Sequence, residues 1–134
     1  MQELTVLVVD DMRSMRSIVK GVLSEMGFKN MHEAADGSEA LSILRSKKID
    51  LVISDVEMPK MDGIQLLDEV DQDEELKDIP FIMLTAMNDK EKVVEILQHK
   101  VRDFVLKPIN PQMLEQRVQA FLNDNPQEVP DLDA

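Results

Sequence analysis

Short apolar runs alternate five times with longer segments of helical period along this chain. The first, third and fourth runs are almost continuously apolar, as strands buried on both faces are. The runs cover residues 4–9, 29–34, 49–54, 80–84 and 103–106. Apolar residues at helical spacing follow each run within a few residues. The pattern predicts an α/β domain of five βα units: a doubly wound parallel sheet with right-handed crossovers and helices on both faces.

Residues typical of helix ends mark the first and fifth helical segments. Gly27 follows the apolar stripe of the first segment and is typical of a helix C-terminus. Asn110 and Pro111 precede the stripe of the fifth, and we expect them to be its N-cap and first helical residue.

The helical period ends at Asn123, and the composition changes there. Residues 124–134 contain two prolines, four acidic residues and no basic residue. A segment of this kind buries too little apolar surface to fold, so we expect a flexible tail. The sequence therefore predicts one domain over residues 1–123 and an acidic tail over residues 124–134.

The charge balance argues against nucleic-acid binding. The 134 residues include 27 acidic and 15 basic residues, for a net charge of −12. Binding to DNA or RNA draws most of its affinity from Lys and Arg that neutralise phosphates. The chain also lacks Cys, which excludes disulfides, thiolate zinc sites and a thiol nucleophile. Its N-terminal apolar run is too short for a signal peptide or a membrane span, so we expect a cytoplasmic protein without membrane contact.

Polar residues that can support chemistry stand at the ends of four predicted strands. In an open α/β sheet, ligands bind outside the carboxyl ends of the strands. The residues at those ends are Asp10 and Asp11, Asp55, Thr85, and Lys107. Three carboxylates, one hydroxyl and one ammonium are therefore expected to converge at one edge of the sheet.

Three neighbouring carboxylates repel one another unless a cation neutralises part of their charge. Oxygen donors without His or Cys favour Mg²⁺, with Mn²⁺ as an alternative, and Mg²⁺ commonly shares its shell with phosphate. One Asp can then be a nucleophile that accepts a phosphoryl group. Each residue alone has a structural explanation, since Asp10 or Asp11 could cap a helix and Lys107 could be a solvated lysine. Their joint placement favours a site for phosphoryl chemistry.

Four motifs, in order and spacing, resemble the receiver domain of two-component response regulators. They read VLVVDD up to Asp11, DVEMPKMDG from Asp55, LTA up to Ala86 and FVLKP up to Pro108. The resemblance covers residues 4 to about 123 and is strongest to stand-alone, CheY-like chemotaxis regulators. It implies a flavodoxin-like, CheY-like fold with strand order 2-1-3-4-5.

The resemblance implies a role for each acidic residue. Asp55 would accept a phosphoryl group from the phosphohistidine of a histidine kinase. Mg²⁺ would be held by Asp10, Asp11, Asp55 and the backbone carbonyl of Glu57. The protein would be no conventional enzyme, because it would catalyse only its own phosphorylation and dephosphorylation.

The same resemblance implies how the phosphoryl group is bound and read. Thr85, Ala86 and Lys107 would bind it, and the Lys107–Pro108 peptide bond would be cis. Thr85 would move toward the phosphoryl oxygens, and Phe104, at the family's switch position, would rotate into the vacated space. The surface of the fourth helix, fifth strand and fifth helix would change, and a target such as a flagellar motor switch would bind it. We expect the receiver to be a monomer.

Two alternatives use the same residues differently. Phosphatases of the haloacid-dehalogenase type also form an aspartyl-phosphate, but they have a second Asp two residues after the first-strand nucleophile, where this chain has Met12. They also carry a cap domain, which is missing here. A degenerate receiver that serves only for docking is the other alternative, and the intact set of functional side chains argues against it.

The two histidines, His32 and His99, lie far apart in the sequence and have no carboxylate or second His at ligand spacing. We expect no catalytic role for either. His99, near the end of the fourth helix, is expected to complement the helix dipole.

Overall fold

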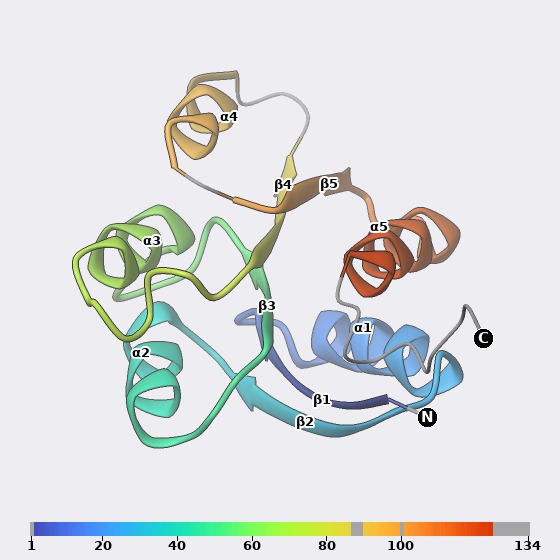
Figure 1. Ribbon diagram of the computed structural model, residues 1–134. Helices are drawn as coiled ribbons and strands as arrows, with labels where there is room; N and C mark the ends of the chain where they lie inside the picture. Colours follow the sequence, from blue (N-terminus) through green and yellow to red (C-terminus); the bar gives the residue numbers. More distant parts are fainter. Residues whose placement is uncertain (1, 87–89, 100, 125–134) are drawn as a thin grey trace.

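The computed structural model describes residues 2–86, 90–99 and 101–124 (Figure 1). The strands are β1 (Gln2–Val9), β2 (Phe28–Ala34), β3 (Leu51–Asp55), β4 (Phe81–Ala86) and β5 (Asp103–Lys107). The helices are α1 (Arg13–Glu25), α2 (Gly37–Ser46), α3 (Gly63–Asp71), α4 (Lys90–Leu97) and α5 (Pro111–Asn123). The predicted alternation of strand and helix is confirmed. Apart from Asp124, which follows α5 as its C-cap, the predicted tail lies outside the described residues.

The five strands form one parallel sheet in the order β2-β1-β3-β4-β5, as predicted. Helices α1 and α5 cover one face, and α2 and α3 cover the other (Figure 1). The strand order reverses at β1, whose two neighbours are β2 and β3. Open α/β sheets bind ligands at such a reversal, which places the ends of β1 and β3 at the expected site.

The period-two alternation of the buried strands divides the interior into two cores. Leu7 and Val9 of β1 face the core under α2, α3 and α4, whereas Val6 and Val8 face the core under α1 and α5. All four side chains are fully buried. The continuous apolar runs of the sequence therefore serve two helical layers at once.

The predicted helix ends are confirmed. Gly27 follows α1 with φ 97°, a left-handed conformation that Gly adopts readily. The Asn110 side chain accepts hydrogen bonds from the backbone N–H groups of Gln112 and Met113, and Pro111 is the first residue of α5.

The strand boundaries shift from those expected. β3 begins at Leu51, and the carboxylate of Asp50, just before it, accepts a hydrogen bond of 2.9 Å from the Thr5 backbone N–H of β1. β4 continues to Ala86, so that Thr85 lies within the strand and is paired in register with Leu106.

Helix α4 buries one of its side chains that the structure describes. Among its side chains that the structure describes, Ile96 is buried, whereas Val94 and Leu97 are more than half exposed. None of the helices in the described part of the chain is long and apolar enough to cross a membrane.

A second attachment follows α4, at His99. Its Nδ1 lies 2.6 Å from Asp71 Oδ2, and its Nε2 lies 3.2 Å from Asp68 Oδ1. Both carboxylates belong to α3, about thirty residues earlier in the chain, so no sequence spacing could reveal them. The expectation that His99 only complements the α4 dipole was therefore incomplete, because this side chain ties α4 to α3.

We expect His99→Ala to lower the free energy of unfolding by about 1 kcal/mol, since it removes two partly exposed contacts, with Asp68 and with Asp71. Urea denaturation at neutral pH measures the change. The matched control is His32→Ala on the edge strand β2, for which we expect less than half that loss. An equal loss in both variants would contradict a specific α3–α4 attachment.

Candidate functional site

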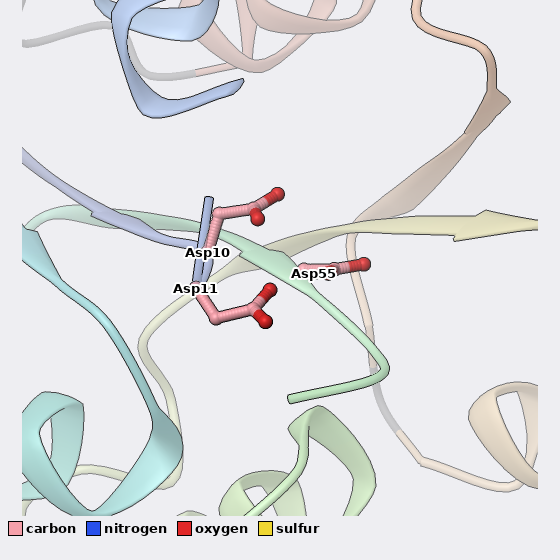
Figure 2. Close-up of side chains that lie close together, drawn as sticks. All are labelled: Asp10, Asp11 and Asp55. Carbon is pink, nitrogen blue, oxygen red and sulfur yellow. The ribbon is translucent and has the colours of Figure 1, made fainter. Parts of the chain in front are cut away.

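Three carboxylates converge at the carboxyl ends of β1 and β3 (Figure 2). One oxygen each of Asp10, Asp11 and Asp55 can be chosen so that all three lie within 4.8 Å of one another. Asp10 and Asp55 are buried, whereas Asp11 is exposed. The side chains meet because β1 and β3 are neighbours in the sheet and end at the same edge.

Asp10 is held rigidly but has one unused oxygen. Its backbone N–H donates to the carbonyl of Ala34, and its Oδ1 accepts a hydrogen bond of 2.9 Å from the Met12 N–H. Its Oδ2 is buried without a hydrogen-bond partner, and the Lys107 ammonium is 3.7 Å away. A buried carboxylate oxygen without a hydrogen-bond partner is suited to binding a cation.

Asp55 makes the closest contact with a positive charge in the site. Its Oδ1 lies 2.9 Å from Lys107 Nζ and also accepts a hydrogen bond of 2.9 Å from the Val56 N–H. Lys107 is the last residue of β5, and the peptide bond that links it to Pro108 is cis. The ammonium reaches Asp55 and Asp10 across the end of β4, which lies between β3 and β5 in the sheet.

Burial and mutual repulsion disfavour the ionised forms of the carboxylates in this site. Burial raises the pKa of Asp10 and of Asp55 above the ordinary value, and the neighbouring carboxylates add to both shifts. Burial alone would lower the pKa of Lys107, but its contacts with Asp55 and Asp10 raise it overall. Lys107 therefore stays charged and offsets only part of the repulsion.

The other predicted site residues differ in their burial and in the elements that carry them. Thr85 is buried near the end of β4, and Ala86 is exposed and paired in register with Lys107. Phe104 is half-buried in β5 and packs against the core under α2, α3 and α4. Glu57 follows β3 with an exposed side chain. In the described part of the chain, the carboxylate cluster consists of the three Asp residues alone.

The cluster fits a hard divalent cation. All its donors are carboxylate oxygens, and one of them is buried without a hydrogen-bond partner. Mg²⁺ and Mn²⁺ prefer such donors, and a divalent charge would relieve the repulsion among them.

Two residues that bind the backbone at or near this site were not predicted from the sequence. Arg16 of α1 donates a hydrogen bond of 2.7 Å to the backbone carbonyl of Asp10. Gly37, the first residue of α2, donates a hydrogen bond of 2.8 Å to the carbonyl of Met61, in the loop after β3. In the sequence, Arg16 is an ordinary polar residue of an amphipathic helix, and Gly37 only marks where a helix begins.

The comparisons with known proteins agree with this geometry. The response regulator receiver domain matches residues 6–119 of the chain. The chain belongs to this receiver family. Members of the family are signalling domains rather than conventional enzymes.

The receiver's similarity to single-domain relatives extends over most of both chains. The chain is 39% identical to the chemotaxis protein CheY-3 of Vibrio cholerae over 117 residues, which cover 87% of this chain and 90% of that protein. It is 40% identical to the chemotaxis protein CheY of Pseudomonas aeruginosa, over 85% of this chain and 92% of that protein. The structure of the chemotaxis response regulator CheY4 of Vibrio cholerae superposes with a TM-score of 0.81 at 34% identity, over 89% of this chain and 98% of that one.

Proposed function

We propose that this receiver is a phosphorylation-activated switch in which Asp55 accepts a phosphoryl group from a histidine kinase. The observation that carries the proposal is the placement of Asp55: its buried carboxylate lies 2.9 Å from the Lys107 ammonium and within a cluster of three carboxylates. A nucleophilic carboxylate, a fixed cation and a further cation site are the parts that phosphoryl transfer needs.

The hydrogen bonds of Asp55 select the attacking atom. Oδ1 is engaged by Lys107 and by the Val56 N–H, which leaves Oδ2 for the attack. A bond forms from Oδ2 to phosphorus while the bond between phosphorus and the donor's imidazole nitrogen breaks, and the electron pair stays on the imidazole. Lys107 can then turn toward the phosphoryl oxygens, and Thr85 and Ala86, at the same edge, complete the phosphoryl site.

Mg²⁺ would be held by Asp10, Asp11, Asp55 and the backbone carbonyl of Glu57. When bound, it supplies positive charge that stabilises the phosphoryl oxygens in the transition state. The unpartnered Oδ2 of Asp10 supports this assignment.

Phosphorylation would be read at the surface of α4, β5 and α5. Thr85 lies on β4 and Phe104 on the neighbouring strand β5, which supports the proposal that these two switch residues are coupled. The exposed Val94 and Leu97 of α4 give that surface apolar character suited to protein binding. Because relatives are named chemotaxis proteins, we infer a target protein in chemotaxis, such as a flagellar motor switch. We further propose that the receiver spans residues 1–123 and is cytoplasmic and monomeric.

Incubation with acetyl phosphate and Mg²⁺ is expected to add one phosphoryl group, seen by intact mass, to the wild type but none to Asp55→Ala, because Asp55 is the nucleophile. Asp78→Ala, which removes an exposed carboxylate outside the site, is the matched control and should behave as the wild type.

Other results would favour the alternatives. If neither acetyl phosphate nor a phosphorylated kinase gives an adduct, the proposed switch is wrong, and a receiver that serves only for docking is favoured. Many cycles of hydrolysis of a generic phosphate ester would favour a phosphatase. The exposed Met12, where such a phosphatase carries its second Asp, argues against that result.

A further inference from the structure

The loops that follow β1 and β3 at the carboxylate cluster are both attached to a third segment of the chain, residues 33–37, which supplies none of the proposed ligands. This segment, the β2–α2 turn, joins the end of β2 to the start of α2. Its contacts run in two directions, to the loop after β1 and to the loop after β3.

Toward β1, the β2–α2 turn holds the backbone of Asp10 at two atoms. The Ala34 carbonyl accepts a hydrogen bond of 3.1 Å from the Asp10 N–H. Arg16 Nη1 donates to the Asp10 carbonyl over 2.7 Å, while its Nε donates to Glu33 over 2.9 Å. Lys20 also binds Glu33, at 2.6 Å. The Asp10 carbonyl therefore has a partner, Arg16, that is itself held by the carboxylate of Glu33.

Toward β3, the β2–α2 turn holds the loop of residues 56–62, which carries Glu57. The Gly37 N–H donates to the Met61 carbonyl over 2.8 Å. The two backbones approach so closely that a Cβ at Gly37 would lie 2.5 Å from that carbonyl oxygen and 2.8 Å from Met61 Cγ. No side chain fits there without moving the loop, because real Cβ atoms do not approach other atoms so closely. Beside this contact, Lys60 Nζ lies 3.9 Å from Asp36 Oδ2.

We infer that the β2–α2 turn is a positioning element for the cation site, in which Gly37 and Glu33 set the spacing of ligands that belong to two other loops. The inference rests on the proposed Mg²⁺ site and adds residues that act on it from outside. Mg²⁺ requires nearly octahedral oxygens at about 2.0–2.1 Å, whereas Ca²⁺ accepts more oxygens at about 2.3–2.6 Å in flexible arrangements. A displaced loop should therefore weaken Mg²⁺ binding more than Ca²⁺ binding.

The experiment is a titration of full-length protein with Mg²⁺ and with Ca²⁺, followed by amide NMR. Gly37→Ala is expected to weaken Mg²⁺ binding by about tenfold, as changes to groups that orient ligands do, and to weaken Ca²⁺ binding less. Gly21→Ala is the matched control, because a Cβ at this exposed α1 position has no atom within 4 Å. It should leave both affinities unchanged.

A second variant tests the contacts of the β2–α2 turn with the loop after β1, and it adds no atoms to a packed region. Glu33→Ala frees Arg16 from its ion pair and is expected to weaken Mg²⁺ binding several-fold, with Glu25→Ala, an exposed residue at the end of α1, as its control. This arm decides the matter if Gly37→Ala does not fold. A change in the ratio of the two affinities separates positioning from a general loss of stability, which leaves that ratio unchanged.

Two negative results are distinguishable. If the wild type binds Mg²⁺ and the folded variants keep both its affinity and its preference over Ca²⁺, the positioning role is wrong and the proposed site stands. If the wild type itself binds no Mg²⁺, both are wrong.

Discussion

Asp10→Asn is expected to stabilise the metal-free protein by on the order of 1 kcal/mol and to weaken Mg²⁺ binding at least about tenfold. Asp10 is fully buried beside two other carboxylates, and its Oδ2 has no hydrogen-bond partner. Asn keeps an oxygen for the Met12 N–H, and its amide can donate toward the remaining carboxylates. The charge that costs stability is thus the charge that binds the cation.

The gain should depend on pH with a defined sign. Burial raises the pKa of Asp10 in the folded state, so its ionisation lowers stability as the pH rises through that pKa. Asn does not ionise. The stability difference between Asp10→Asn and the wild type should therefore be small in acid and grow toward neutral pH. Urea denaturation at several pH values, with and without Mg²⁺, measures it.

The exposed Asp78 offers a control for that measurement. Asp78→Asn should change neither the stability nor the Mg²⁺ affinity appreciably, because its carboxylate is solvated. Destabilisation by Asp10→Asn at neutral pH in the absence of metal would show that repulsion does not dominate the energetics of the site.

Lys107→Ala is expected to slow phosphoryl uptake from acetyl phosphate by about a hundredfold at saturating Mg²⁺. The loss of one preorganised electrostatic contact in an active site typically slows a reaction by this factor. Lys107 is the cation closest to Asp55 Oδ1, at 2.9 Å. Without it, Asp55 loses the contact that opposes its raised pKa, and the phosphoryl oxygens lose a partner. Intact mass as a function of time gives the rate.

Lys77→Ala is the matched control, since Lys77 is exposed and lies before β4, outside the site. Its uptake rate should equal that of the wild type. If Lys107→Ala is phosphorylated as fast as this control, Lys107 has no part in the proposed mechanism, whatever the effect of the substitution on stability.

Much of the fold and the carboxylate cluster could be predicted from the sequence because both depend on short-range patterns. Continuous apolar runs indicated a parallel sheet, and a parallel sheet brings strand ends to one edge. Asp10, Asp11 and Asp55 therefore had to lie near one another once the strands had been placed correctly. Errors of one or two residues at strand ends did not affect this conclusion, since Asp55 ends β3 as expected of a site residue.

The contacts that could not be predicted join elements far apart in the chain. The pairing of His99 with Asp68 and Asp71 depends on how α4 packs beside α3. The approach of Gly37 to Met61 depends on the spacing of two loops to within a few tenths of an ångström. One sequence contains the residue types for such contacts but does not contain the distances.

The sparse attachment of α4 has a consequence for the energy needed to switch this domain. Ile96 is the one buried side chain among those of α4 that the structure describes, and His99 adds contacts with Asp68 and Asp71 of α3. Local opening of such a unit requires less free energy than global unfolding, because the core under α1 and α5 stays closed. A phosphoryl group that binds one arrangement of the site a few kcal/mol better than the other is then enough to invert the populations. In the proposed mechanism, phosphorylation of Asp55 would therefore shift α4 between two arrangements without global unfolding.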